Sequence, residues 1–253
     1  MKKPAWVIEK ERDRRAAAAQ TVWLFGLHAV RDALLNPARE RLRLVVTRNA
    51  ADRLADAIAA SGLTPEIADA RRFSAPLDPG SVHQGAALEV RPLDWGAIDD
   101  YVADPAPVLL LDRVSDPHNV GAVLRSAEVF GAAAVIAPAR HSAPETGALA
   151  KAASGALERQ PYLRVRNLGA AIATLREAGR AILGLDGEAE MTLAQGLAGA
   201  GPVGLVLGAE GPGLRAGTRS ACTRIVRIPA AGRFGSLNVS NAAAVALYAA
   251  MAG

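Results

Sequence analysis

Asn119 and Arg125 are the first residues along the chain whose types and spacing could do chemistry. They lie in the segment 112–131, which begins D-x-x-x-D-P-x-N-x-G-x-x-x-R. In a helix that begins at Asn119, Arg125 points away from the apolar face and Gly121 leaves bare backbone beneath the guanidinium. Such a surface suits an anionic ligand, and Asn119 is placed to cap the helix. An ordinary amphipathic helix with an exposed arginine explains the pattern equally well.

A glycine-rich loop around Glu210 is the second candidate. The apolar run that ends at Leu207 leads into Gly208, Gly211 and Gly213, so backbone groups could approach a ligand closely there. The order of the glycines differs from the dinucleotide fingerprint, and the lysine and hydroxyl residue of a phosphate-binding P-loop are missing. A turn with a solvated carboxylate is the simpler interpretation of this loop taken alone.

The third candidate is the segment from Ile228 to Asn241. Ser236, Asn238 and Ser240 stand before or at the start of a predicted helix, where side-chain oxygens can cap the helix or contact a ligand. The small residues between them would let the chain pass close to neighbouring backbone. A capped C-terminal helix is the competing interpretation, and no nucleophile elbow or zinc-protease motif occurs elsewhere in the chain.

These three loops follow predicted strands of one domain, residues 107–253. Apolar strands alternate there with amphipathic helices, which favours a mostly parallel sheet covered by helices on both faces. Ligands of such sheets bind beyond the carboxyl ends of the strands, so the loops after Leu111, Leu207 and Ile228 are the expected site. The expected strands are 108–111, 133–136, 163–165, 181–185, 203–207 and 225–228, and the expected helices are 119–130, 146–153, 168–178 and 239–252.

A smaller α/β domain is expected before it, at residues 21–91, joined by a proline-containing linker at 92–106. Its predicted helices are 26–35 and 51–61, and its predicted strands are 42–47, 65–67 and 86–90. Residues 1–20 are interpreted as a charged, solvated tail.

Arginine dominates the basic residues of the chain. Lysine supplies only four of the 29 basic side chains, and guanidinium groups bind phosphate in a bidentate manner and stack on bases. Five arginines in the segment 39–53 outnumber its two acidic residues, and we interpret Arg41, Arg43 and Arg48 as candidate RNA contacts. Genome composition explains the arginine content equally well, and a solvated strand edge is the competing interpretation of this segment.

Composition excludes several classes of protein. With 253 residues, 51% hydrophobic, the chain can bury a core and is neither disordered nor fibrous. One cysteine excludes an internal disulfide, and four scattered histidines without a cysteine partner exclude an ordinary structural zinc site. No apolar run reaches the length of a membrane span, and the start lacks a secretory signal, so a cytoplasmic protein without a metal is expected.

Taken together, the three segments resemble the motifs of the SpoU (TrmH) family of RNA ribose 2′-O-methyltransferases, in the SPOUT superfamily. Beside the first motif, L-G-x-E-G-x-G and I-P-x-x-G-x-x-x-S-L-N-V-S stand in the same order as in the family. Residues 154–158 resemble a further family segment. Residues 25–30 and 82–85 resemble the accessory substrate-binding domain of members that modify large-subunit ribosomal RNA, so the resemblance covers nearly all of 22–253.

The resemblance implies a trefoil-knotted catalytic domain preceded by the small α/β domain, and a homodimer that uses S-adenosylmethionine. The implied substrate is RNA, with a guanosine of 23S ribosomal RNA foremost. Arg125 would act at the ribose 2′-hydroxyl, through a substrate phosphate or as an electrostatic stabiliser, because a guanidinium is a poor base. Asn119, Glu210 and Asn238 would complete the catalytic set. The residues implied to bind the cofactor are Leu207, Gly208, Gly211, Gly213, Ile228, Gly232, Ser236 and Leu237.

The chain departs from the family pattern at Ala230, where methionine is common, and at Phe234 and Asn241. These departures leave the class and the cofactor intact but weaken any claim about the target nucleotide. A transfer-RNA methyltransferase is the alternative within the family, although such members typically lack the accessory domain. A non-catalytic ribosome-assembly factor on the same fold is the alternative outside enzymology. A nicotinamide-dependent oxidoreductase fits the order of elements but lacks the fingerprint.

Overall fold

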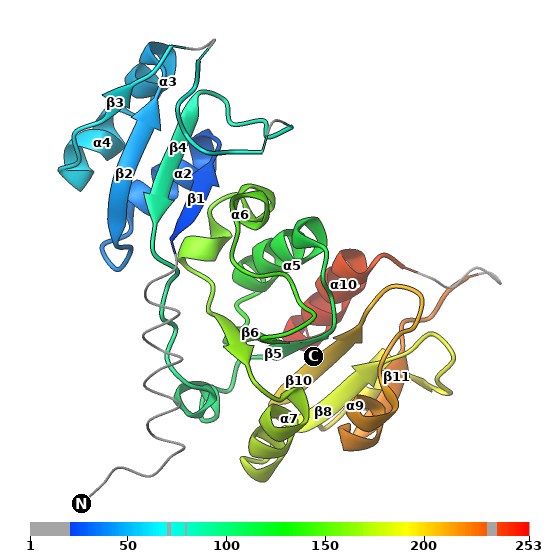
Figure 1. Ribbon diagram of the computed structural model, residues 1–253. Coiled ribbons are helices and arrows are strands. Elements are labelled where there is room, and N and C mark those ends of the chain that lie inside the picture. The colour runs from blue at the N-terminus through cyan, green and yellow to red at the C-terminus, as the bar shows by residue number, and fades with distance from the viewer. Residues whose placement is uncertain (1–20, 70–71, 79, 232–236, 253) are drawn as a thin grey trace, which may run out of the picture. The chain divides into compact units, whose positions relative to one another are not determined.

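The computed structural model describes residues 21–69, 72–78, 80–231 and 237–252 (Figure 1). The chain divides into two compact units. Unit 1 consists of residues 1–94 and 145–151, and unit 2 of residues 95–144 and 152–253. The expected tail, 1–20, lies outside the described residues. No helix in the described ranges is long and apolar enough to cross a membrane.

Unit 1 contains a four-stranded sheet in the order β1-β4-β2-β3. Strand β4 pairs antiparallel with β1 and β2, and β3 runs parallel to β2. Its elements are β1 (Val22–Phe25), α2 (Leu27–Leu35), β2 (Arg41–Val46), α3 (Arg48–Arg53), α4 (Ala55–Ser61), β3 (Glu66–Ile67) and β4 (Ala86–Val90). The predicted helix 51–61 is therefore two short helices, and β1 was not predicted, because a strand of four residues carries little periodicity.

Unit 1 also includes the start of α6 (Gly147–Ala153), although this segment lies far along the chain. A Cβ on Gly147 would lie 2.3 Å from the Trp23 carbonyl oxygen, so only glycine permits this approach to β1. The buried Arg39 donates to the Arg91 carbonyl at 2.7 Å and forms an ion pair with Glu145. Contacts between residues so distant in the sequence explain why the predicted domain boundaries omit this segment.

Unit 2 contains seven parallel strands in the order β7-β6-β5-β10-β8-β11-β9. The strands are β5 (Val108–Asp112), β6 (Ala134–Pro138), β7 (Tyr162–Val165), β8 (Ala181–Leu185), β9 (Met191–Thr192), β10 (Val203–Gly208) and β11 (Arg224–Arg227). The helices are α5 (Pro117–Val129), α7 (Leu168–Glu177), α8 (Leu193–Leu197), α9 (Ala216–Ala221) and α10 (Val239–Ala252), with short 3₁₀ turns η1 (Ile98–Tyr101) and η2 (Ala156–Glu158).

Helices cover both faces of this sheet, as the alternating pattern predicts. Alternate residues of β5, Val108 and Leu110, pack with Leu168 and Ile172 of α7 in one buried cluster. Helices α5 and α10 lie side by side on the other face (Figure 1). The expected α/β class with a mostly parallel sheet is confirmed. The trefoil knot stays a prediction from the family resemblance.

Residues 95–106 are not a free linker but part of unit 2. Trp95, Ile98 and Tyr101 pack against the core cluster of the sheet. The buried Arg180 donates to the carbonyl oxygens of Ala106 at 2.8 Å, of Tyr101 at 3.3 Å and of Asp104. The prolines and acidic residues that suggested a linker therefore lie in an irregular segment held by one guanidinium.

Candidate active site

Strand β5 and helix α5 place the first motif at the carboxyl edge of the sheet. Asp116 caps α5, because its carboxylate accepts from the His118 backbone N–H at 2.9 Å, and Pro117 occupies the first helical position. The prediction that Asn119 caps this helix is wrong, because the helix begins two residues earlier. Asn119 lies inside the first turn, where its half-buried side chain is free to bond to other segments.

Three of the four predicted catalytic residues lie together. The Asn119 amide donates from Nδ2 to Oε1 of Glu210 at 3.1 Å. The Asn238 amide donates from Nδ2 to the same Glu210 oxygen at 2.7 Å and to Oδ1 of Asn119 at 2.9 Å. These side chains come from the first turn of α5, the loop after β10 and the segment before α10, so the network joins all three motifs.

Neutral amides are the hydrogen-bond donors to Glu210. Within the described residues no cationic side chain pairs with this carboxylate, so it keeps its negative charge uncompensated. Asn238 is itself fixed, because its Oδ1 accepts from the backbone N–H of Ser240 at 2.9 Å and from the Ser240 hydroxyl. The network therefore holds one negative charge and two amide groups in a set orientation.

Arg125 lies apart from this network. Its side chain is exposed on α5, and no hydrogen bond or ion pair joins it to another described residue. It follows Asn119 by six residues, about 240° around the helix, which sets it on another face. Gly121 is buried with Val120 and Leu124, so the expectation that it leaves open backbone beneath Arg125 is wrong.

The glycine loop after β10 folds back on itself. Ala209 and Gly213 form an isolated bridge, and the Gly213 N–H donates to the Ala209 carbonyl at 2.9 Å. A Cβ on Gly208 would lie 2.1 Å from the Gly213 carbonyl carbon, which no side chain permits. Gly211 and Gly213 adopt φ values of 84° and 66°, where L-residues are strained. The glycines therefore shape a tight loop whose backbone faces outward.

This loop forms one side of a pocket of about 970 Å³. Six of the predicted cofactor residues line it: Leu207, Gly208, Gly211, Gly213, Ile228 and Leu237. The other two, Gly232 and Ser236, lie outside the described residues. Glu210 and Asn238 also line the pocket, so it opens beside the polar network.

Sequence reasoning missed the pocket wall that follows β8, formed by Leu185, Asp186, Gly187 and Glu188. The segment 181–185 was predicted as a buried strand, and its carboxyl end lies at the same edge of a parallel sheet as the other loops. An Asp-Gly pair directly after it was a usable signal. Arg227, Ala230 and Ala242 line the pocket as well.

The pocket has the chemistry that S-adenosylmethionine requires. Its volume suits a ligand of this size, and leucine and isoleucine side chains offer apolar surface for a base. Glu188 and Glu210 outnumber Arg227 in the lining, since Asp186 is paired with Arg219, and this balance favours a positively charged ligand such as a sulfonium. No group of His, Cys, Asp and Glu in the described part of the chain could hold a metal ion.

The three candidate RNA contacts of unit 1 differ in their surroundings. Arg43 binds Glu66 through two hydrogen bonds, of 2.7 and 2.8 Å, and lies 5.7 Å from the centre of the Trp23 ring. This hydrogen bond raises the pKa of Arg43 and lowers that of Glu66. Arg41 donates to the Leu34 carbonyl, and Arg48 is exposed on α3. Only Arg48 presents a guanidinium with no partner among the described residues.

Comparison with known proteins shows the family of the chain. The family model described as "SpoU rRNA Methylase family" matches residues 106–248. The chain is 38% identical to the 23S rRNA (guanosine-2′-O-)-methyltransferase RlmB of Yersinia pestis, covering 89% of this chain and 94% of the relative. It is 39% identical to the protein of the same name from Escherichia coli K12, covering 90% and 97%.

Solved structures agree on the fold. The SpoU methyltransferase AviRb from Streptomyces viridochromogenes matches with a TM-score of 0.77 and 25% identity, covering 96% of this chain and 91% of that one. An AdoMet-bound rRNA methyltransferase from Sinorhizobium meliloti matches with a TM-score of 0.77 and 24% identity, covering 96% and 89%. The chain therefore belongs to the SpoU rRNA methylase family.

Proposed function

We propose that this protein transfers a methyl group from S-adenosylmethionine to the ribose 2′-hydroxyl of a guanosine in 23S ribosomal RNA. The observation that carries the proposal is the hydrogen-bonded set of Asn119, Glu210 and Asn238 beside a pocket shaped by glycines. Family membership and relatives named for this activity, aligned over nearly their whole length, support it.

The pocket residues would hold the cofactor, whose sulfonium supplies an electrophilic methyl group. Leu207, Ile228 and Leu237 offer apolar surface, and the outward backbone of the glycine loop offers hydrogen-bonding groups. Gly232 and Ser236 are proposed to complete the site. The protein then has little covalent chemistry to perform, so positioning of the 2′-hydroxyl and exclusion of water become its main tasks.

Arg125 is proposed to act at the ribose, by binding the adjoining phosphate or by stabilising the developing oxyanion. Its guanidinium remains protonated at neutral pH, so it donates hydrogen bonds rather than accepting the proton itself. A substrate phosphate bound by Arg125 is a better proton acceptor. Asn119, fixed by Glu210 and Asn238, would orient the substrate beside it.

A homodimer is proposed because α5 and α10 expose a continuous apolar strip. Val129 and Tyr248 have exposed fractions of 74% and 58%, and Val245 and Met251 are exposed one turn before and after Tyr248. The Tyr248 ring packs edge-on against Phe130, 6.1 Å between centroids, which joins the two helices. An apolar strip of this kind marks a protein interface. Arg125 lies one turn from Val129, so a second subunit on the strip would cover the side of Arg125 that is open in one chain.

Unit 1 is proposed to contact the RNA, with Arg48 as its freest guanidinium and with Arg41 and Arg43 at the edge of β2. The phosphate backbone supplies most of the affinity of such contacts. RNA binding away from the pocket would set which nucleotide reaches the catalytic residues.

The test is methyl transfer from labelled S-adenosylmethionine to separated 23S, 16S and transfer RNA. The modified position is mapped by its resistance to alkaline cleavage, which needs a free 2′-hydroxyl. Label confined to one guanosine of 23S RNA is the expected result. Label in transfer RNA would replace the proposed substrate, and cofactor binding without transfer to any RNA or to ribosomal precursor particles would favour an assembly factor.

A further inference from the structure

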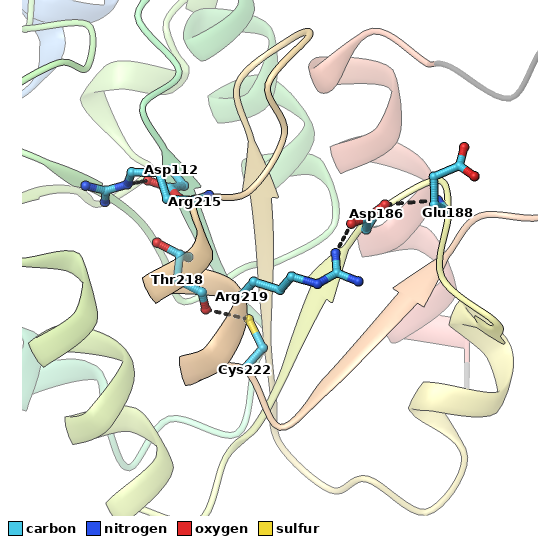
Figure 2. A network of polar contacts seen from close by, with 7 residues as sticks. All are labelled: Asp112, Asp186, Glu188, Arg215, Thr218, Arg219 and Cys222. Atoms are coloured by element: carbon cyan, nitrogen blue, oxygen red, sulfur yellow. Dashed lines mark hydrogen bonds and ion pairs between the residues drawn. The ribbon is translucent and has the colours of Figure 1, made fainter.

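Two arginines at helix α9 each bind an aspartate at the carboxyl end of a strand. Arg215 is the N-cap of the helix, and Arg219 lies within it. Arg215 precedes the helix, and the Arg219 N–H donates to its carbonyl at 2.8 Å, so the two lie one helical turn apart. Figure 2 shows their side chains pointing to opposite sides of α9, one toward Asp112 and the other toward Asp186. Each aspartate borders a different wall of the pocket.

The first pair closes the glycine loop. The Asp112 carboxylate is fully buried and accepts from the Arg215 backbone N–H at 3.0 Å and from Arg215 Nε at 2.7 Å. Asp112 ends β5 and lies in register with Gly208, the last residue of β10. The loop 209–214 therefore leaves the sheet beside Asp112 and returns to it at Arg215, so the length and direction of the loop are fixed at both ends.

The second pair fixes the wall after β8. The Asp186 carboxylate accepts from the Glu188 backbone N–H at 2.9 Å and also binds the Arg219 guanidinium (Figure 2). The Asp186 N–H donates to the Val226 carbonyl at 2.9 Å, and the Ala189 N–H donates to the Asp186 carbonyl at 3.2 Å. Asp186 and Glu188 line the pocket, so Arg219 holds the turn that carries both.

Stability alone does not explain a buried carboxylate at this position. Burying Asp112 costs desolvation energy, and apolar residues of similar volume generally stabilise such a site as well as an ion pair does. An ion pair that is accompanied by a hydrogen bond from a backbone N–H, in contrast, fixes the direction of the chain as well as the distance between the groups. The two pairs therefore serve the geometry of the loops.

We infer that Arg215 and Arg219 are positioning residues that hold the glycine loop and the Asp186–Glu188 turn in the arrangement that binds the cofactor. This inference rests on the proposed function, because it takes the pocket to be the S-adenosylmethionine site. Neither arginine lines the pocket: Arg219 acts through Asp186, which does, and Arg215 is bound by Asp112 directly after Leu214, the last pocket residue of the glycine loop. Loss of either pair would weaken cofactor binding while the remaining fold of the sheet is kept.

The reactivity of Cys222 can report the position of α9, because Cys222 is the single cysteine of the chain and caps the C-terminus of this helix. Its thiol donates to the Thr218 carbonyl at 3.2 Å (Figure 2), and a Cβ on Gly184 of β8 would lie 2.9 Å from its Sγ. Burial raises the pKa of the Cys222 thiol to about 11. The thiol is therefore neutral and half-buried at pH 8, and an increase in its labelling rate reports that α9 has moved from the sheet.

The experiment compares Asp112→Asn, Arg215→Gln and Arg219→Gln with Arg159→Gln as the matched control. Arg159 binds Glu128 on the surface of the same unit and does not line the pocket. Calorimetry measures S-adenosylmethionine affinity, and a disulfide reagent measures the Cys222 labelling rate with and without the cofactor. We expect each of the three variants to lose about tenfold in affinity and to label about tenfold faster.

Two results separate a positioning role from a general loss of stability. Saturating S-adenosylmethionine is expected to slow labelling in the wild type, since cofactor and α9 would stabilise the same arrangement. Asp112→Asn combined with Arg215→Gln is expected to lose little more affinity than either change alone. Unchanged affinity with faster labelling would overturn the inference, because α9 would then serve the fold only.

The outcome for the proposed site is read separately, from the wild type and Gly208→Val. If the wild type binds S-adenosylmethionine and Gly208→Val does not, the pocket is the cofactor site whatever the arginine variants do. If Gly208→Val binds normally, the proposed site itself fails, and the positioning role falls with it.

Discussion

The edge of β2 in unit 1 and the carboxyl edge of the parallel sheet in unit 2 both gather polar side chains, but with opposite results. At β2, Arg43 is bound by Glu66 and Arg41 by the Leu34 carbonyl, so these groups are used within their own unit. At the parallel edge, Asn119, Glu210 and Asn238 bond to one another, and Glu210 and Asn238 line a pocket.

The difference follows from sheet geometry. Parallel strands deliver all their carboxyl ends to one edge, so loops from distant segments meet there and their side chains converge. In the mixed sheet, side chains of neighbouring strands lie close enough for opposite charges to pair: Glu66 of β3 is in register with Val45 of β2, and Arg43, two residues before Val45, binds it. The candidate catalytic residues are therefore concentrated in unit 2, and the following predictions test that contrast.

Arg125→Ala should have the largest effect, because it removes the group proposed to act at the 2′-hydroxyl. We expect methyl transfer to fall by at least about a thousandfold, while S-adenosylmethionine affinity stays within about twofold. Single-turnover transfer and calorimetry measure the two quantities on the same preparation. Loss of affinity in place of rate would mean that Arg125 belongs to the cofactor site.

Gly208→Val should abolish cofactor binding, because a Cβ at this position would overlap the backbone of Gly213. We expect an affinity loss of at least about a hundredfold, with transfer falling in parallel. Gly217→Ala is the matched control, since nothing lies within 4 Å of a Cβ there. A variant that bound the cofactor normally would place the site elsewhere.

Tyr248→Asp should break the proposed dimer, because it places a charge in the exposed apolar strip of α5 and α10. The expected result is a monomer in sedimentation velocity with the cofactor pocket intact, and transfer reduced by about a hundredfold if Arg125 works beside a second subunit. A stable dimer in this variant would show that the strip is not the dimer interface. A fully active monomer would show that methyl transfer does not need a second subunit.

Arg180→Ala should destabilise unit 2. This variant tests whether an arginine of unit 2 that lies away from the pocket serves the fold alone. The change frees carbonyl groups of Tyr101, Asp104 and Ala106 in the 95–107 segment. We expect a loss of about 3 kcal/mol in the free energy of unfolding, measured by denaturant titration. Arg180→Lys should recover only part of it, because an ammonium cannot span the same acceptors. An effect no larger than that of Arg159→Ala would contradict this role.

Sequence motifs predicted most of the residues that the structure brings together at the pocket, because glycine loops of this kind depend on backbone shape. The glycines at 208, 211 and 213 predict a loop that other residues could not form: Gly208 approaches the Gly213 backbone closely, and Gly211 and Gly213 adopt positive φ. The class of fold also followed from alternating apolar segments. The pairing of Arg43 with Glu66 could not be predicted, because the two residues are 23 positions apart and a local count of charges ignores strand pairing.

The prediction for Asn119 was likewise limited by what a local sequence pattern can show. Its residue type and motif were informative, but its function as a helix cap was assigned from a predicted start that lies two residues too late. The helix at 146–153 was predicted, but the place of residues 145–151 in unit 1 was not, since it depends on Gly147 meeting β1 and on Glu145 meeting the buried Arg39. Contacts of this kind are set by tertiary structure and leave no local periodicity.

Arg43→Ala and Arg48→Ala should have the smallest effects, and the difference between them tests whether the β2 edge contacts RNA. If Arg48 binds a phosphate, its loss lowers the slope of log affinity against log salt by about 1. Arg43 is held by Glu66, so its loss should change the slope by less. An equal drop for both variants would mean that RNA displaces Glu66.

The pH dependence of the same pair gives an independent reading. Arg43 lowers the pKa of Glu66 below its ordinary value, so the pair stabilises the fold above pH 4.5 and this contribution disappears as the pH falls through the lowered value. In Arg43→Ala the pKa of Glu66 should return toward 4.5, which carboxylate NMR titration measures directly. RNA that recruits Arg43 should raise the pKa of Glu66 in the wild type in the same way. RNA that binds through Arg48 alone should leave it unchanged, so one titration with and without RNA decides whether the basic strand edge is part of the substrate-binding surface.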